Sequence, residues 1–300
     1  MVRDALTRAG WGLVAIVVVA ACQAGMGRAH GQDATPGRQG RSEATSDPTA
    51  AARNRMVQRH LVERGIKNPR VLEAFRTVPR HRFLPPNTRR QAYDDESIPI
   101  GEGQTITPPY DVALMTEALG LKPTDKVYEV GTGSGYQSAI LSRLVKEVYS
   151  VEIHAPLGER AARVHKELGY DNIHTRIGDG YEGWPEAAPF DAIIVTCAPH
   201  RIPRPLIDQL KEGGRMAIPL GDRFTQSVHL VVKKDGKLID RELKPTLFVP
   251  MTGKAQKEGP EPKPAAGAPA QEPAKGSRGR GRSSKSQSKS GAKESSGGAG

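Results

Sequence analysis

The chain contains few cysteines and lacks several motifs that mark common types of site. Its 300 residues include only two cysteines, Cys22 and Cys197, so a disulfide framework is excluded. Cysteine and histidine are nowhere clustered at the spacing of a metal site, and no G-x-S-x-G segment marks the nucleophile of a serine hydrolase. The sequence therefore predicts neither a metal site nor a serine nucleophile of this kind.

Long hydrophobic runs are also scarce. The clearest run covers residues 11–21, which is short for a membrane span and typical of a signal-peptide core. Residues 19–22 resemble a lipoprotein cleavage box that would place a lipid on Cys22, whereas small residues at 29–31 offer an ordinary cleavage site. An uncleaved anchor or a wrongly assigned start codon would explain the same run. We expect residues 1–31 to be a signal peptide or lipoprotein leader of an exported, cell-envelope (periplasmic) protein; a cytoplasmic location is the alternative.

The net charge of +11 is concentrated near the C-terminal end. Residues 254–300 contain ten Lys and Arg against four Glu, a net charge of +6, and residues 1–50 contribute +1. The remaining +4 on residues 51–253 is ordinary for an enzyme. We therefore expect no specific nucleic-acid partner and membrane contact only through the leader. Nothing in the sequence indicates an oligomer, and a monomer is expected.

Composition divides the chain into a leader, a spacer, one domain and a tail. Residues 32–50 and 254–300 are rich in Gly, Ala, Pro, Ser and charge, lack hydrophobic periodicity, and are predicted to be disordered. Between them, residues 51–253 are long enough for one sizeable α/β domain.

Helices and strands alternate through most of this domain. Hydrophobic periodicity and caps predict helices at residues 51–65, 68–75, 111–119, 136–145, 157–168 and 205–210. Apolar runs predict strands at residues 126–130, 148–153, 173–177, 190–196 and 215–219, then two antiparallel strands, 226–232 and 238–249. This order predicts an α/β fold with a mostly parallel sheet, helices on both faces and an antiparallel edge.

The most informative segment is VYEVGTGSGY, residues 127–136, because it combines a strand, a glycine turn and the start of a helix. Its glycines, Gly131, Gly133 and Gly135, allow the backbone to approach a ligand closely. A dinucleotide-binding turn follows G-x-G-x-x-G, and its last glycine would fall at Tyr136. The observed pattern, E-x-G-x-G-x-G starting at Glu129, is the one that S-adenosylmethionine enzymes use. The sequence therefore predicts S-adenosylmethionine as the cofactor.

Acidic residues near the ends of neighbouring strands can bind the rest of this cofactor. Glu129 can face its ammonium group, and Glu152 can accept hydrogen bonds from both ribose hydroxyls. Asp179 and Gly180 follow the third strand, where a carboxylate can bind the adenine amino group. Each residue alone is equally consistent with an ordinary turn or strand end, so the prediction depends on their combination.

Residues 98–110, IPIGEGQTITPPY, precede the glycine turn and are predicted to form a loop. They resemble the G-x-x-Q-T-I-S segment of the protein-L-isoaspartate (D-aspartate) O-methyltransferase family at Gly101, Gln104, Thr105, Ile106 and Thr107. Further segments are similar to the family in the same order, at residues 64–85, 178–199, 206–221 and 248–253. The resemblance covers residues 53–253 and implies the fold of class I S-adenosylmethionine-dependent methyltransferases.

The resemblance also implies a reaction and the residues of its acceptor site. The family's active-site serine falls at Thr107, which keeps the hydroxyl and adds a methyl group. Gln104, Val249 and Thr252 fall in the segments that the resemblance assigns to substrate binding. The implied reaction is methyl transfer to the free carboxylate of L-isoaspartyl residues in damaged proteins and peptides. The ester then closes to a succinimide, which reopens partly to aspartate.

Two other functions stay open from the sequence alone. The same fold carries methyltransferases of other acceptors, such as small molecules or nucleic acid. An exported protein would also lie away from the cytosolic supply of S-adenosylmethionine, which leaves an inactive envelope binding protein as an alternative. Residues 101–110 and 249–252 favour the isoaspartyl acceptor.

Overall fold

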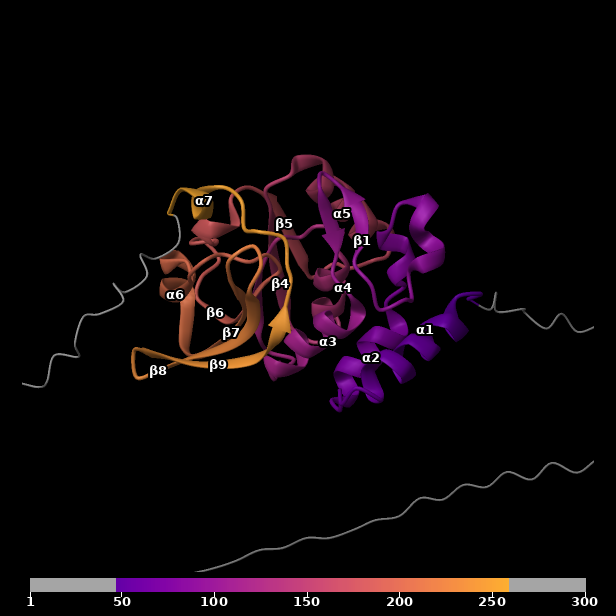
Figure 1. Ribbon diagram of the computed structural model, residues 1–300, viewed down its shortest axis with the longest axis horizontal. Helices are drawn as coiled ribbons and strands as arrows, with labels where there is room; N and C mark the ends of the chain where they lie inside the picture. Colours follow the sequence, from indigo (N-terminus) through magenta and orange to yellow (C-terminus); the bar gives the residue numbers. More distant parts are fainter. Residues whose placement is uncertain (1–46, 259–300) are drawn as a thin grey trace, which may run out of the picture. The chain divides into compact units, whose positions relative to one another are not determined.

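The computed structural model describes residues 47–258, and Figure 1 shows their arrangement as a ribbon. The predicted leader, including Cys22, and most of the predicted spacer and tail lie outside these residues. Within residues 47–258, no helix is long and apolar enough to cross a membrane.

A seven-stranded sheet forms the centre of the domain, with the strand order β5-β4-β3-β6-β7-β8-β9. Its strands are β3 (Lys126–Val130), β4 (Glu147–Glu152), β5 (Ile173–Ile177), β6 (Phe190–Val195), β7 (Leu210–Gly221), β8 (Gln226–Lys234) and β9 (Lys237–Thr246). β3 to β7 run in parallel, whereas β8 and β9 pair in antiparallel fashion at one edge. The chain builds the sheet from β3 to β5 in one direction and then returns to place β6 beside β3. The predicted α/β fold, with a mostly parallel sheet and an antiparallel edge, is confirmed.

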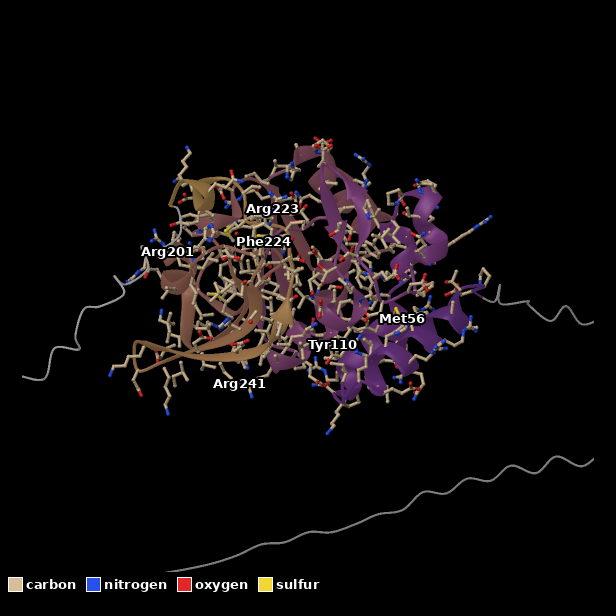
Figure 2. The ribbon with its side chains drawn as sticks, in the orientation of Figure 1. Met56, Tyr110, Arg201, Arg223, Phe224 and Arg241 are labelled. Atoms are coloured by element: carbon tan, nitrogen blue, oxygen red, sulfur yellow. The ribbon has the colours of Figure 1, made fainter. Side chains whose placement is uncertain are left out.

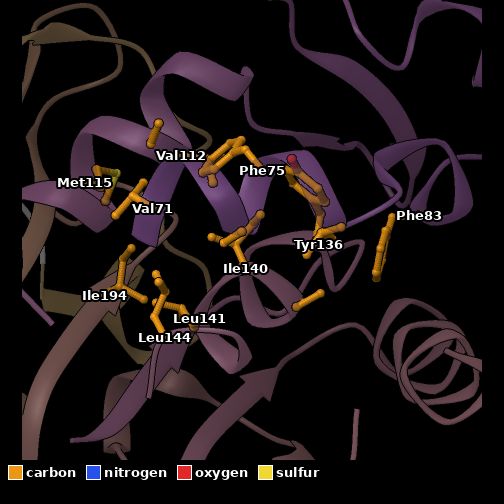
Figure 3. Close-up of a cluster of buried hydrophobic side chains, with 14 of the residues drawn as sticks. Val71, Phe75, Phe83, Val112, Met115, Tyr136, Ile140, Leu141, Leu144 and Ile194 are labelled. Atoms are coloured by element: carbon orange, nitrogen blue, oxygen red, sulfur yellow. The ribbon is translucent and has the colours of Figure 1, made fainter. Parts of the chain in front are cut away.

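Alternate residues of the central strands pack on opposite faces of the sheet. In β6, Ala192 and Ile194 belong to one hydrophobic cluster, whereas Ile193 and Val195 belong to another. The first cluster includes side chains of α2, α3 and α4, and Figure 3 shows Ile194 below Val71 and Met115 and beside Leu141. The second includes Leu206 of α6. The helices are α2 (Pro69–Thr77), α3 (Pro109–Ala118), α4 (Tyr136–Ser142), α5 (Ala155–Glu167) and α6 (Arg204–Gln209).

Residues 47–95 form an N-terminal helical layer that shares the first of these clusters. α1 (Ala50–Met56) begins one residue before the predicted domain boundary and continues as a π-helical segment, η1 (Val57–Val62). Met56, labelled in Figure 2, is 1% exposed and belongs to the same cluster as α2, α3 and α4. The layer also contains two 3-10 turns, η2 (Arg80–Phe83) and η3 (Pro86–Gln91). Because it shares this core, the layer folds as part of the domain.

The segment predicted as a loop at residues 98–110 is instead largely a β-hairpin followed by α3. β1 (Ile98–Gly101) pairs in antiparallel fashion with β2 (Gln104–Ile106). Ile98 and Ile100 are buried while the residues between and after them are exposed, which is the alternation of a half-buried strand. The glycines that suggested a loop form the tip, where Gly101, Glu102 and Gly103 all have positive φ.

The C-terminal part of the domain differs from the prediction at three points. β7 begins at Leu210 rather than at residue 215. β9 ends at Thr246 rather than at residue 249, because Val249 and Met251 pair with Ala198 after β6. In addition, the first residues of the predicted tail form a short helix, α7 (Lys254–Glu258). Asp179 accepts a hydrogen bond from the Lys254 backbone N–H at 2.8 Å, which holds the start of this helix against the domain.

Candidate active site

A cavity of about 780 Å³, measured with its open mouth, lies at the carboxyl ends of the parallel strands. Its wall includes Val130 at the end of β3, Glu152 at the end of β4 and Thr196 directly after β6. This is the point where the strand order reverses, which is where open α/β sheets bind ligands.

Most of the predicted site residues meet in this cavity. Its wall contains Gln104, Thr107, Gly131, Gly133, Glu152, Asp179, Gly180, Val249 and Thr252. Two predicted residues, Glu129 and Gly135, lie outside the wall. The structure therefore brings the predicted cofactor and acceptor segments to one place, although they are far apart in sequence.

The glycine turn between β3 and α4 has a backbone that favours glycine at each of its three positions. Gly131, Gly133 and Gly135 have φ angles of 89°, 54° and 88°. A Cβ atom on Gly131 would lie 2.5 Å from the Thr196 hydroxyl oxygen, and one on Gly135 would lie 2.6 Å from His165 Nε2. The same two side chains hold the turn: the Thr196 hydroxyl donates to the Gly131 carbonyl at 2.7 Å, and His165 Nε2 lies 2.8 Å from the Gly135 carbonyl. Gly135 thus lies outside the cavity wall and supports the turn through its contact with His165.

Both carboxylate oxygens of Glu152 accept hydrogen bonds from backbone N–H groups. Its Oε2 accepts a hydrogen bond from the Gly133 N–H at 2.7 Å, and its Oε1 accepts one from the His154 N–H at 2.9 Å. The side chain is only 4% exposed and still reaches the cavity wall. Because a carboxylate oxygen can accept more than one hydrogen bond, each oxygen keeps capacity for a ligand hydroxyl.

The structure places Glu129 away from the cavity, although the sequence predicted contact with the cofactor's ammonium group. Its fully buried carboxylate accepts hydrogen bonds from Ser138 of α4 and, at 2.6 Å, from Ser150 of β4. Successive strand residues point to opposite faces, so Val130 reaches the cavity wall while Glu129 faces α4. Glu129 joins β3, β4 and α4 beneath the glycine turn.

Burial raises the pKa of the Glu129 carboxyl from 4.5 to about 7. The folded protein therefore holds a proton that the unfolded chain releases between about pH 4.5 and 7, so this group lowers stability increasingly as pH rises through that window. We expect Glu129→Gln to increase the free energy of unfolding by roughly 1–3 kcal/mol at pH 8 and by much less at pH 5. Urea unfolding at both pH values measures this difference. An equal effect at the two pH values would contradict the assigned ionisation.

Asp179 and Gly180 lie in the cavity wall just after β5. The Asp179 carboxylate accepts hydrogen bonds from the backbone N–H of Tyr181 at 3.0 Å and of Lys254 at 2.8 Å. Gly253 allows this approach, because a Cβ atom there would lie 2.3 Å from Asp179 Oδ2. Asp179 therefore connects the end of β5 to the C-terminal segment of the domain.

The residues predicted to bind the acceptor line the cavity from the hairpin and from residues 249–252. Thr107 follows β2 directly and precedes α3, and within the described chain its hydroxyl has no protein hydrogen-bond partner. Ala198 donates its N–H to the Val249 carbonyl at 2.8 Å and accepts from the Met251 N–H at 2.9 Å. This pairing fixes residues 249–251 beside the end of β6.

Sequence reasoning missed several residues that shape the site. Thr196 and Cys197 line the cavity after β6, and His154 lines it after β4. Burial raises the pKa of the Cys197 thiol, which keeps it protonated. The carboxyl ends of parallel strands meet at one edge of a sheet, so inspection of the last residue of each predicted strand and of the residue after it would have found these three. No comparable signal points to His165, which lies within α5.

The cavity suits a nucleoside that carries a positive charge. Its wall contains the carboxylates of Glu152 and Asp179, and no Lys or Arg of residues 47–258 belongs to it. The Glu152 carboxylate is fixed by two backbone N–H groups, and the glycine turn brings backbone to the wall. These features fit S-adenosylmethionine. In the same part of the chain, no group of three or more His, Cys, Asp or Glu residues could hold a metal ion.

Comparison with known proteins gives the family. Residues 51–256 match the family model described as protein-L-isoaspartate(D-aspartate) O-methyltransferase. The chain belongs to this family. A protein-L-isoaspartate O-methyltransferase of Opitutus terrae is 55% identical over 201 residues, which cover 67% of this chain and 86% of the relative. One from Gloeobacter violaceus is 48% identical over 204 residues, covering 68% of this chain and 100% of the relative.

Solved structures of family members are also similar. One protein-L-isoaspartate O-methyltransferase has a TM-score of 0.62 and 32% identity, covering 68% of this chain and 67% of its own. A putative family member from Plasmodium falciparum, in complex with S-adenosyl-L-homocysteine, has a TM-score of 0.60 and 26% identity, covering 67% of this chain and 98% of its own. The predicted family, the class I methyltransferase fold and S-adenosylmethionine as methyl donor are confirmed.

Proposed function

We propose that this family member transfers the methyl group of S-adenosylmethionine to the free carboxylate of L-isoaspartyl residues in damaged proteins and peptides. This is the reaction named for its relatives. One observation carries the proposal: Thr107 and residues 249–252 line the same cavity as the glycine turn and Glu152. The methyl acceptor and methyl donor would therefore meet inside one cavity.

The proposed reaction needs positioning more than acid–base chemistry. S-adenosylmethionine, when bound, supplies the activated methyl group. The acceptor carboxylate has a pKa near 4 and is already ionised at neutral pH, so no side chain needs to remove a proton. Thr107 donates its hydroxyl to this carboxylate, and residues 249–252 hold the adjoining peptide. Such positioning contributes up to roughly 7–11 kcal/mol to lowering a reaction barrier.

Glu152 and Asp179 hold the donor in this proposal. Each carboxylate is fixed by two backbone N–H groups, so Glu152 is ready to accept the ribose hydroxyls and Asp179 the adenine amino group. Gly131 and Gly133 allow the backbone to approach the amino-acid part, while Gly180 lies beside the adenine site. Glu129 and Gly135 do not line the cavity, and their role is to support the glycine turn.

The acceptor assignment is tested by a pair of peptides. Labelled methyl groups should pass from S-adenosylmethionine to a peptide containing L-isoaspartate, and not to the same sequence containing L-aspartate. Equal transfer to both peptides would show a methyltransferase of another acceptor. Absent transfer, with cofactor binding intact by calorimetry, would show a binding protein. Either outcome would overturn the proposed function.

Thr107 is tested by two substitutions. We expect Thr107→Val to lower kcat on the isoaspartyl peptide by about 100-fold, because it removes a hydrogen bond to a charged group and leaves the shape nearly unchanged. Thr107→Ser restores the hydroxyl and should retain activity within about fivefold. Calorimetry should show cofactor affinity close to normal in both variants. A loss of cofactor affinity in Thr107→Val would contradict the role given to Thr107.

We further propose that the protein acts as a monomer in the cell envelope, without a specific nucleic-acid partner, and contacts membrane only through its leader. The support is the hydrophobic run at residues 11–21 and the modest charge of residues 51–253. Mass spectrometry of the mature protein tests the leader. A chain that starts at Met1 and fractionates with the cytoplasm would overturn export, and a lipid-modified Cys22 would identify the lipoprotein route.

A further inference from the structure

Arg80 is a fully buried arginine whose guanidinium has no hydrogen-bond partner. It begins η2 in the N-terminal helical layer and is 0% exposed. Its Nε, Nη1 and Nη2 atoms are all buried, and none is hydrogen-bonded to another part of residues 47–258. A buried charge of this kind is strongly unfavourable unless another group compensates it.

The surroundings of Arg80 leave its charge without a neutralising acid. Burial lowers the pKa of Arg80 to about 10, so the group is still cationic at neutral pH. Asp95 is the carboxylate that acts on it, but Asp95 already forms an ion pair with Arg64 and accepts the Tyr110 N–H at 2.8 Å. Burial raises the pKa of Tyr136, so that phenol is neutral and cannot compensate the charge.

Arg80 lies next to Tyr136, a residue of the cavity wall. Its guanidinium carbon is 4.8 Å from the centre of the Tyr136 ring, and Tyr136 is itself a wall residue. Phe75 and Phe83 contact the same ring edge-on, at centroid distances of 6.0 and 5.7 Å, and Figure 3 shows the three aromatic side chains near one another. These contacts hold the ring in place beside Arg80.

The cavity is therefore electrically asymmetric. The ends of β4 and β5 contribute the carboxylates of Glu152 and Asp179 to the wall, whereas beside Tyr136 lies a cation that has no hydrogen-bond partner within residues 47–258. S-adenosylmethionine carries one carboxylate, on its amino-acid group. Repulsion from Glu152 and Asp179 disfavours that carboxylate at their side, and attraction to Arg80 favours it at the Tyr136 side.

We infer that Arg80 is a positioning residue that attracts the carboxylate of S-adenosylmethionine to the Tyr136 side of the cavity without touching it. This electrostatic attraction acts partly through the protein interior, where it is screened less than in bulk water. It orients the donor so that its nucleoside lies at the acidic side. The inference rests on the assigned cofactor and holds whichever molecule accepts the methyl group.

The test compares two ligands that differ only in the carboxylate. Calorimetry on the full chain measures binding of S-adenosylmethionine and of its decarboxylated analogue. We expect Arg80→Met to weaken S-adenosylmethionine about tenfold and to leave the analogue unchanged or slightly tighter. Arg80→Lys, which keeps the charge, should hold S-adenosylmethionine within about threefold of the wild-type affinity. Arg80→Gln provides the same comparison if Arg80→Met does not fold.

Arg53 supplies a matched control. It is a buried arginine of the same layer, 7% exposed, but it is partnered by an ion pair to Asp47 at 2.8 Å. Arg53→Met should lower stability and leave the ratio of the two affinities unchanged. Equal weakening of both ligands by the uncharged Arg80 variants would show a merely structural role and overturn the inference. So would a changed ratio in Arg53→Met, or an effect confined to the KM of the peptide.

Discussion

Replacing Glu152 by alanine should weaken S-adenosylmethionine binding by about 100-fold or more. The substitution removes a carboxylate whose two oxygens are fixed by the N–H groups of Gly133 and His154 and which we assign to the ribose hydroxyls. Hydrogen bonds to a charged group contribute roughly 1.5–3 kcal/mol each, so two of them account for about 3 kcal/mol or more. At about 1.4 kcal/mol per factor of ten, that is a loss of at least 100-fold in affinity. Calorimetric titration measures it directly.

Glu147→Ala is the control for this substitution, because Glu147 begins the same strand at the end remote from the cavity. It should leave the affinity within about twofold. A Glu152→Ala variant that bound the cofactor within threefold of wild type would remove the ribose assignment and leave Glu152 as a support of the glycine turn.

Replacing Gly135 by alanine should destabilise the whole domain by about 3 kcal/mol. Gly135 has a φ of 88°, which costs another residue roughly 1–2 kcal/mol. The added Cβ would also lie 2.6 Å from the buried His165 ring and 3.0 Å from the Cβ of Ala161, and overpacking of this kind costs roughly 1–3 kcal/mol. Urea unfolding measures the total loss in the free energy of unfolding.

Gly169→Ala separates the cost of a positive φ from the cost of overpacking. Gly169 has a φ of 71° after α5, and a Cβ atom there meets nothing within 4 Å. This variant should lose only about 1 kcal/mol. Equal losses in the two variants would show that backbone strain alone matters at Gly135 and that its packing against His165 does not.

The central strands of the sheet could be predicted from the sequence because they are buried on both faces. Lys126–Val130 and Ile173–Ile177 match their predicted ranges, and the Asp235-Gly236 turn lies between β8 and β9 as expected. The hairpin at residues 98–106 was missed because two isoleucines and a few polar residues form a pattern too short to distinguish from a loop. Its pairing depends on burial against the rest of the domain, which a local pattern does not reveal.

Cavity residues at the ends of strands could be predicted from the sequence. Residues whose place depends on the direction of the side chain could not. Glu152 is the last residue of β4, and its carboxylate reaches the cavity. Glu129 is one residue before the end of β3, so the pleat turns it toward α4. A one-residue difference in position thus separates a wall residue from a buried support. Arg80 and His165 act from other elements, and only the folded packing brings them near the turn.

The pairing of Ala198 with residues 249–251 has a consequence for synthesis on the ribosome. The wall around Thr107 is completed by residues near Thr252, at the very end of the folded domain. The Lys254 N–H that holds Asp179 also comes from this last segment. Because domains generally fold as units, the cavity is not complete until residues 249–254 have emerged and the chain has returned to β6. A chain that stops before residue 249 therefore lacks both the wall formed by residues 249–252 and the contact that holds Asp179.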